Sequence, residues 1–212
     1  NMAFQSIWYF TDLPKDTINT LEKELCKYDS KLEESRLHGD VLDKGKRKST
    51  NGWLSSDSWI AGFLWHYVQK ANRNNFLYDL THIDGESLQY TRYGVGEYYG
   101  WHTDHSLATY YKPSFNNIPS AETLNNANFH TDRINQSYEE IRKLSFSLQL
   151  SNPDDYEGGN VVLLDDSNKQ YVAPRQRGSI ILFDSRTMHR VCKVTKGVRK
   201  SIVGWVVGPR WK

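Results

Sequence analysis

The sequence predicts a mainly β protein with flanking α-helices, in which a double-stranded β-helix (jelly-roll) core packs against N-terminal helices. Three observations predict this class. Apolar residues recur at helical spacing in residues 2–86, the rest of the chain is typical of short strands, and turn signals separate these strands. Eight short strands with such punctuation favour two sheets that close into a jelly roll.

Two helices are predicted in residues 2–86, which we expect to support the core and to carry a lid. The first follows Pro14, and Asp16 or Thr17 can cap it. Its apolar stripe consists of Ile18, Leu21 and Leu25. The second begins near Asp57 or Ser58, because apolar residues recur at helical spacing after that point. Its apolar stripe consists of Ile60, Phe63, Leu64, Tyr67 and Val68.

Residues 87–212 are predicted to form the jelly-roll core. The clearest strand is Leu144–Leu150, where apolar and polar residues alternate with a period of two. Gly158-Gly159 and Arg177-Gly178 are typical of turns. The candidate strands are residues 87–93, 97–103, 144–151, 160–164, 170–173, 179–183, 189–194 and 199–207.

Two further segments are typical of loops. Residues 41–51 contain the basic run Lys44–Lys48, for which we favour a solvated loop over a lid edge that contacts substrate. Residues 106–143 are polar and rich in asparagine, and insertions of this length are commonly functional or disordered. We therefore expect residues 106–143 to form a loop or lid beside the opening of a site.

The composition excludes several classes of protein. A chain of 212 residues with 38% hydrophobic residues suits one domain, expected over residues 2–212. Its net charge of +2 gives no electrostatic case for a nucleic-acid or membrane partner, and no apolar run approaches the roughly 20 residues of a membrane helix. Cys26 and Cys192 give no disulfide framework. We expect a cytoplasmic protein, microbial or encoded by a virus in its host cell, whose oligomeric state is unknown.

A His-x-Asp pair carries the clearest chemistry in the sequence. His102 and Asp104 are two residues apart on a predicted strand, so both side chains should face the same side. Such a pair and one distant histidine make a facial triad, which leaves open positions on a ferrous ion. His189, at the start of a later strand, is the expected third ligand.

Arg199 follows His189 by ten residues, a spacing with a structural reason. A turn at Thr195-Lys196-Gly197 would reverse the chain and place Arg199 on the strand adjacent to that of His189. Its guanidinium would then reach into the barrel near the metal, where a planar, permanently charged fork suits a carboxylate. Without the triad, an ordinary surface arginine would be the better interpretation.

Three stretches together resemble the prolyl 4-hydroxylases, a family of Fe(II)- and 2-oxoglutarate-dependent oxygenases that includes the PKHD type. They are residues 89–104 (QYTRYGVGEYYGWHTD), 148–164 and 178–205. Their order and spacing match jointly over roughly the C-terminal half to two thirds of the chain, which makes the pattern specific. The resemblance implies Fe(II) on His102, Asp104 and His189, with Arg199 on the distal carboxylate of 2-oxoglutarate.

The resemblance also implies further binding residues. Tyr93 lies where relatives place a tyrosine that helps to bind 2-oxoglutarate. Ser145 and Gln149 lie on the strand that lines the pocket, at positions where relatives often have Thr and Tyr. The residues that correspond to a substrate-holding Arg-x-Ser element and to an aromatic wall are Arg47, Ser49, Tyr99 and Trp101.

The implied activity is hydroxylation of peptidyl proline, coupled to oxidative decarboxylation of 2-oxoglutarate to succinate and CO2. The implied cofactors are Fe(II), 2-oxoglutarate, dioxygen and ascorbate, and the implied partner is a proline-containing protein or peptide. Hydroxylation of another amino-acid side chain or of a free amino acid remains open, as does a non-catalytic, cupin-like binding module. Nucleic-acid demethylation is disfavoured, because that branch has a second arginine where this chain has Trp205.

Overall fold

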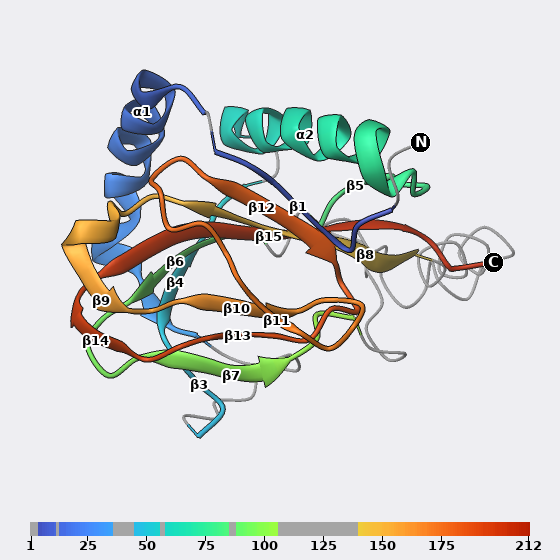
Figure 1. Cartoon of the computed structure of the whole chain (residues 1–212). Helices are drawn as coiled ribbons and strands as arrows, with labels where there is room; N and C mark the ends of the chain where they lie inside the picture. The colour runs from blue at the N-terminus through green and yellow to red at the C-terminus, as the bar shows by residue number, and fades with distance from the viewer. Residues whose placement is uncertain (1–3, 12, 36–44, 56–57, 85–87, 106–139) are drawn as a thin grey trace, which may run out of the picture.

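The computed structural model describes residues 4–11, 13–35, 45–55, 58–84, 88–105 and 140–212. Two β-sheets face each other, and helices cover the outer side of the larger one (Figure 1). This arrangement confirms the predicted jelly roll with flanking helices. No helix among the described residues has the length and apolar character needed to cross a bilayer.

The larger sheet has eight strands and carries most of the core. Its order is β1-β12-β8-β15-β6-β4-β2, and β5 pairs with β15. The strands, in chain order, are β1 (Ile7–Phe10), β2 (Glu33–Glu34), β4 (Thr50–Trp53), β5 (His82–Ile83), β6 (Gln89–Tyr93), β8 (Glu140–Gln149), β12 (Ile180–Asp184) and β15 (Arg199–Pro209).

The smaller sheet has five strands in the order β11-β10-β13-β7-β3. A separate antiparallel pair closes one end of the molecule (Figure 1). The five strands are β3 (Arg47–Lys48), β7 (Tyr98–His102), β10 (Val161–Leu164), β11 (Gln170–Val172) and β13 (His189–Val191). The separate pair consists of β9 (Tyr156–Gly158) and β14 (Val194–Gly197).

Both predicted helices are present, as α1 (Lys15–Leu25) and α2 (Trp59–Ala71). Helix α1 begins directly after Pro14, whose carbonyl accepts the amide of Ile18. Asp16 and Thr17 therefore lie inside the helix, and the prediction that one of them caps it is wrong. Ser58, expected near the start of the second helix, is the N-cap residue of α2, while Asp57 lies outside the described residues. Short helical turns span Cys26–Lys31, Asn72–Phe76 and Pro153–Asp155.

Strand β8 shows how the alternating pattern builds the molecule. Its apolar residues, Leu144, Phe146 and Leu148, are buried in the core beneath α1 and α2. Ser145 and Ser147 alternate with them and line a cavity between the two sheets. The alternation read from the sequence therefore separates an apolar layer from a polar interior.

All eight predicted strands are present, with small shifts of their ends. The structure adds short strands that the sequence analysis did not predict, β1 to β5 in the N-terminal part among them. Residues 140–143, expected in the loop, belong to β8; residues 106–139 lie outside the described part of the chain. Within the basic run, Arg47 is buried on β3, so a fully solvated loop is wrong at that position.

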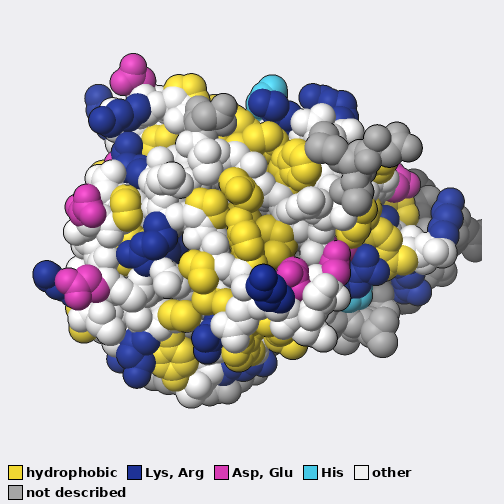
Figure 2. Space-filling model, in the orientation of Figure 1, with side chains coloured by type: hydrophobic (Ala, Val, Ile, Leu, Met, Phe, Trp, Pro, Cys, Tyr) yellow, Lys and Arg dark blue, Asp and Glu magenta, His cyan; other side chains and the backbone are white. Residues whose placement is uncertain are grey.

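Hydrophobic side chains gather over the middle of the face shown in Figure 2, with charged groups mostly toward its margins. Tyr9 of β1 and Tyr171 of β11 stack with their ring centroids 6.4 Å apart. Both strands lie at the ends of their sheets' strand orders, so this stack bridges one edge of each sheet. The aromatic bridge closes that side of the jelly roll with side chains rather than with backbone pairing.

Candidate metal centre

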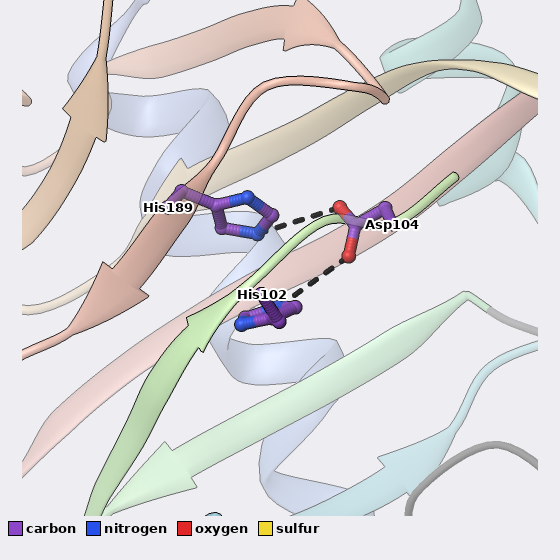
Figure 3. A group of neighbouring side chains, drawn as sticks. All are labelled: His102, Asp104 and His189. Atoms are coloured by element: carbon purple, nitrogen blue, oxygen red, sulfur yellow. Dashed lines mark ion pairs between the residues drawn. The ribbon is translucent and has the colours of Figure 1, made fainter. Parts of the chain in front are cut away.

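Two neighbouring strands of the smaller sheet bring the histidines together. His102 ends β7 and His189 begins β13, and the two residues are direct partners in the antiparallel register. Asp104 lies beyond the end of β7, where its amide donates to the carbonyl of Ser185 over 3.0 Å. The carboxylate thus joins the histidines through a bend, and not through strand alternation as expected. Figure 3 shows the three side chains pointing toward one another.

The three groups form a compact cluster. The Nε2 atoms of His102 and His189 each lie 3.5 Å from an oxygen of Asp104 (Figure 3). One ligand atom from each residue lies within 4.8 Å of the others. Two imidazoles and one carboxylate in this arrangement could hold a divalent metal ion and leave part of its coordination sphere open.

Backbone carbonyls orient both imidazoles. The Nδ1 of His102 lies 2.8 Å from the carbonyl oxygen of Gly100, and that of His189 lies 2.9 Å from the carbonyl oxygen of Thr187. A carbonyl only accepts, so each Nδ1 carries a hydrogen and Nε2 is the nitrogen that is available to a metal ion. This tautomer is the one that a metal ligand needs.

Two serines support the carboxylate of Asp104. Ser145 donates its hydroxyl to Asp104 Oδ2 over 2.6 Å, and its oxygen lies 3.0 Å from the hydroxyl of Ser185. Burial alone would raise the pKa of Asp104, but His189, His102 and the Ser145 hydroxyl together hold it well below its usual range. Asp104 is therefore an anion at neutral pH. Burial lowers the pKa of His189, against the attraction of Asp104, which favours the neutral ring.

Arg199 reaches this centre from the opposite sheet. It begins β15 and pairs with Tyr93 on β6, whereas His189 belongs to the smaller sheet. The expectation that Arg199 lies on the strand adjacent to His189 is wrong, because residues 194–197 form β14 and pair with β9 instead of making a tight turn. Arg199 nevertheless lines the same cavity as the triad.

The guanidinium of Arg199 is a buried cation. Arg199 is only 3% exposed. Burial lowers the pKa of its guanidinium, and the nearby Tyr156 and Tyr93 oppose that shift. No carboxylate in the described part of the chain forms an ion pair with it. Because a buried charge is costly unless it is paired, this cation favours an anionic ligand at its side of the cavity.

The cavity brings most of the predicted site residues together. Gln149 is the exception among the cosubstrate candidates, because it faces an adjoining cavity that Arg199 also lines, and it donates to the Tyr156 hydroxyl over 3.0 Å. The predicted residues that line the cavity of the triad are Arg47, Tyr93, Tyr99, His102, Asp104, Ser145, His189 and Arg199.

Ser49 and Trp101 do not line this cavity. Ser49 accepts a hydrogen bond from Arg47 Nε over 3.0 Å and donates to Ser35 over 2.8 Å. The guanidinium carbon of Arg190 lies 4.7 Å from the centroid of the Trp101 ring. Ser49 therefore supports Arg47 from behind, and Trp101 packs against the next strand.

The structure also shows polar residues that the sequence analysis missed. The carbonyl of Ser185 accepts the amide hydrogen of Asp104. The hydroxyl of Ser185 contacts the hydroxyl of Ser145, which in turn donates to the carboxylate of Asp104. Thr91 and Ser201 are paired across β6 and β15, are at most 1% exposed, and have hydroxyls without a hydrogen-bond partner among the described residues. The sequence pattern that could have identified Ser201 is its position two residues after Arg199, because residues two apart on a strand face the same side.

A jelly roll with two histidines and one carboxylate in its interior is typical of non-haem Fe(II) oxygenases. Comparison with known families supports this class directly. Residues 88–207 match the model of the 2OG-Fe(II) oxygenase superfamily. A PKHD-type hydroxylase of Synechococcus elongatus is 31% identical over 190 residues, which cover 84% of this chain and 72% of the relative. Another, from Picosynechococcus, is 36% identical over 172 residues, 75% of this chain and 64% of the relative.

Solved structures share the fold. A Pseudomonas putida prolyl-4-hydroxylase superposes with a TM-score of 0.66 at 17% identity, covering 97% of this chain and 94% of the other. A Trichoplax adhaerens prolyl hydroxylase, solved with a peptide fragment of the hypoxia-inducible factor, gives a TM-score of 0.68 at 16% identity, covering 95% and 83% of the two chains.

The chain belongs to the 2OG-Fe(II) oxygenase superfamily. It is a 2-oxoglutarate-dependent dioxygenase, and its relatives are PKHD-type hydroxylases. Membership implies Fe(II) as the metal cofactor, with 2-oxoglutarate and dioxygen as the cosubstrates.

Proposed function

We propose that the protein hydroxylates a proline residue of a peptide or protein, with Fe(II) held by His102, Asp104 and His189 and with 2-oxoglutarate anchored by Arg199. One observation carries the proposal: three groups that can ligate a metal converge in a cavity with the buried guanidinium of Arg199, which forms no ion pair with any described residue. The family membership and the hydroxylase relatives support the reaction class.

The donor set fits a ferrous ion. As metal ligands, two imidazoles and a carboxylate contribute a total charge of −1, and one ligand atom from each residue lies within 4.8 Å of the others. An imidazole and carboxylate set with open positions is the arrangement that non-haem Fe(II) oxygenases use. The absence of cysteine from the cluster argues against a structural zinc site of the thiolate type.

Arg199 supplies the charge that the cosubstrate needs. 2-Oxoglutarate is a dianion whose distal carboxylate would receive parallel N–H donors from the guanidinium. Tyr93 pairs with Arg199 across β6 and β15, and the buried hydroxyls of Thr91 and Ser201 lie next along the same strands. Gln149 and Tyr156 continue the polar lining on the other side of Arg199.

When bound, the iron would let dioxygen oxidise both partners, placing one oxygen atom in succinate as 2-oxoglutarate loses CO2 and the other in a substrate C–H bond. The residues of the chain orient and shield the reactants. Ser145 and Ser185 keep Asp104 fixed and charged. The buried apolar side chains of Phe183 and Val191 line the cavity and exclude water from the reacting groups.

Arg47 and Tyr99 are our candidates for contact with the peptide. Both line the cavity beside His102, and Arg47 presents donors that suit a backbone carbonyl. Peptide recognition by the Trichoplax neighbour supports a peptide substrate for a protein of this fold. We also propose ascorbate as the reductant that restores the ferrous state after uncoupled turnover.

The test is succinate release by the purified protein with Fe(II), ascorbate and 2-oxoglutarate. Proline-rich peptides should raise succinate formation and gain the mass of one oxygen atom on proline. Peptides with lysine in place of proline, and free proline, serve as controls for the two alternative substrate classes. A mass gain on those controls but not on the proline peptides would overturn the proposed substrate and leave the reaction class intact.

A binding module without turnover predicts a different pattern. Such a protein would bind Fe(II) but form no succinate with any substrate in the screen. The His102→Ala variant separates contaminating activity from that of the protein, because it should abolish turnover if the triad holds the metal.

A further inference from the structure

A bulge in β7 brings Tyr99 and His102 to the same side of the strand. His189 pairs with His102 and Val191 pairs with Tyr99, so β7 has one residue more than β13 over this stretch. In a regular strand, residues three apart point to opposite faces. The extra residue removes that alternation, and both side chains line the cavity. Bulges beside functional sites commonly re-aim a side chain in this way.

The bulge places the ring of Tyr99 face to face with the imidazole of His102. Their ring centroids lie 3.6 Å apart and their planes differ by 14°. The same imidazole is held at Nδ1 by the carbonyl of Gly100. The hydrogen bond fixes one atom of the ring and the stack fixes its plane, so together they determine where Nε2 points.

Arg47 contacts the same tyrosine. Its guanidinium carbon lies 4.7 Å from the centroid of the Tyr99 ring, and the two residues are direct partners across β3 and β7. The imidazole of His102 and the guanidinium of Arg47 therefore both pack against the Tyr99 ring. Ser49 and Gln89 accept hydrogen bonds from Arg47 over 3.0 Å and 3.4 Å, which hold the cation in place.

We propose that Tyr99 is a positioning residue of the metal centre, whose ring holds the plane of His102 while Arg47 holds the ring. This role goes beyond the aromatic substrate wall inferred from the sequence, and it rests on the proposed metal binding by His102. Substrate that engages Arg47 would act on the metal ligand through one intervening ring.

The experiment measures Mn(II) affinity, with Mn(II) as a redox-stable substitute for Fe(II), by the electron paramagnetic resonance signal of the free ion. The variants are Tyr99→Phe, which keeps the ring, and Tyr99→Leu, which removes it. Tyr171→Leu is the matched control, because it removes a stacked tyrosine from the same sheet at a distance from the site. His102→Ala reports whether the binding is at this centre.

Tyr99→Leu should weaken Mn(II) binding by about tenfold, as loss of a group that orients a metal ligand does. Tyr99→Phe and Tyr171→Leu should stay within about twofold of the wild type on the same principle. Equal Mn(II) affinities of Tyr99→Leu and Tyr171→Leu would overturn the inference. A loss of affinity in Tyr99→Phe as large as that in Tyr99→Leu would also overturn it, because the effect would then belong to the hydroxyl and not to the ring.

Two further outcomes are separable. A wild type that binds no Mn(II) would refute the proposed metal site and the inference with it. So would a His102→Ala variant that binds Mn(II) as tightly as the wild type.

Melting temperatures confirm that each variant is folded. If Tyr99→Leu is unfolded, Tyr99→Met retains apolar volume without a ring and carries the same expectation.

Discussion

Hydrogen bonds from outside the triad decide what its three side chains can do. The carbonyls of Gly100 and Thr187 set the tautomers of the histidines, and Ser145 holds the carboxylate of Asp104. Ser145, which the resemblance implies as a 2-oxoglutarate-binding residue, lines the cavity and donates its hydroxyl to Asp104. It therefore acts on the metal ligand as well as lying where the cosubstrate is expected.

Removing the Ser145 hydroxyl should weaken metal binding. Ser145→Ala leaves a buried carboxylate oxygen without its donor, and loss of such outer partners lowers metal affinity about tenfold or more. Mn(II) titration measures the change. Ser145→Thr keeps the hydroxyl and should stay near the wild type, so an equal loss in both variants would argue for a packing effect.

Arg199 should govern the cosubstrate and not the metal. Arg199→Met removes charge-assisted hydrogen bonds worth roughly 1.5–3 kcal/mol, which is about a tenfold to hundredfold rise in the KM for 2-oxoglutarate. Arg199→Lys should recover part of the loss. A KM for 2-oxoglutarate that Arg199→Met leaves unchanged would remove Arg199 from the site.

The lowered pKa of His189 makes the stability of the metal-free protein depend on pH. Burial disfavours the charged ring in the folded state, while the unfolded chain takes up a proton below about pH 6.5. The unfolded state then binds more protons, so the free energy of unfolding should fall as the pH drops from about 7.5 to about 5.5. Denaturant titrations of the wild type and His189→Gln test this, and equal pH slopes would contradict it.

Elements of the fold follow the sequence where the pattern is local. The alternation at Leu144–Leu150 predicted both faces of β8 correctly, because side-chain direction in a strand needs only a period of two. The path from His189 to Arg199 was not predictable in this way. That path depends on the pairing of β14 with β9, a segment more than 30 residues earlier. The bulge in β7 was not predictable either, because it depends on the register of β7 with β13.

Gly197, the last residue of β14, lies two residues before Arg199 at the start of β15, and its backbone conformation leads to a prediction about an element of the fold. Gly197 has φ +70°, and a Cβ there would collide with the carbonyl of Asp155. Gly96 also has a positive φ, of +82°, but a Cβ there meets nothing within 4 Å. Gly96→Ala should therefore cost only about 1–2 kcal/mol of backbone strain, and Gly197→Ala clearly more.

Chemical denaturation of both glycine variants measures this difference. Gly197→Ala should also raise the KM for 2-oxoglutarate, because the backbone that it distorts lies two residues before Arg199. Equal unfolding free energies for the two variants would show that the β9–β14 contact adjusts without cost.

At the scale of the whole molecule, neither sheet holds a complete site. The smaller sheet supplies both histidines, while the larger sheet supplies Arg199, Tyr93 and Ser145. The sequence predicted these residues through their types and the family resemblance, but it did not predict which sheet each occupies. Formation of the cavity therefore requires the two sheets to pack together, while α1 and α2 cover the outer face of the larger sheet.

Anaerobic titration with Fe(II) and then 2-oxoglutarate tests this joint site most directly, through the visible charge-transfer absorption of a keto acid chelated to Fe(II). The wild type should develop the band at saturating 2-oxoglutarate. His102→Ala should show no band, and Arg199→Met should need a concentration of 2-oxoglutarate at least about tenfold higher to develop it. A wild type without the band, or a His102→Ala variant that retains it, would contradict the account of one centre built by both sheets.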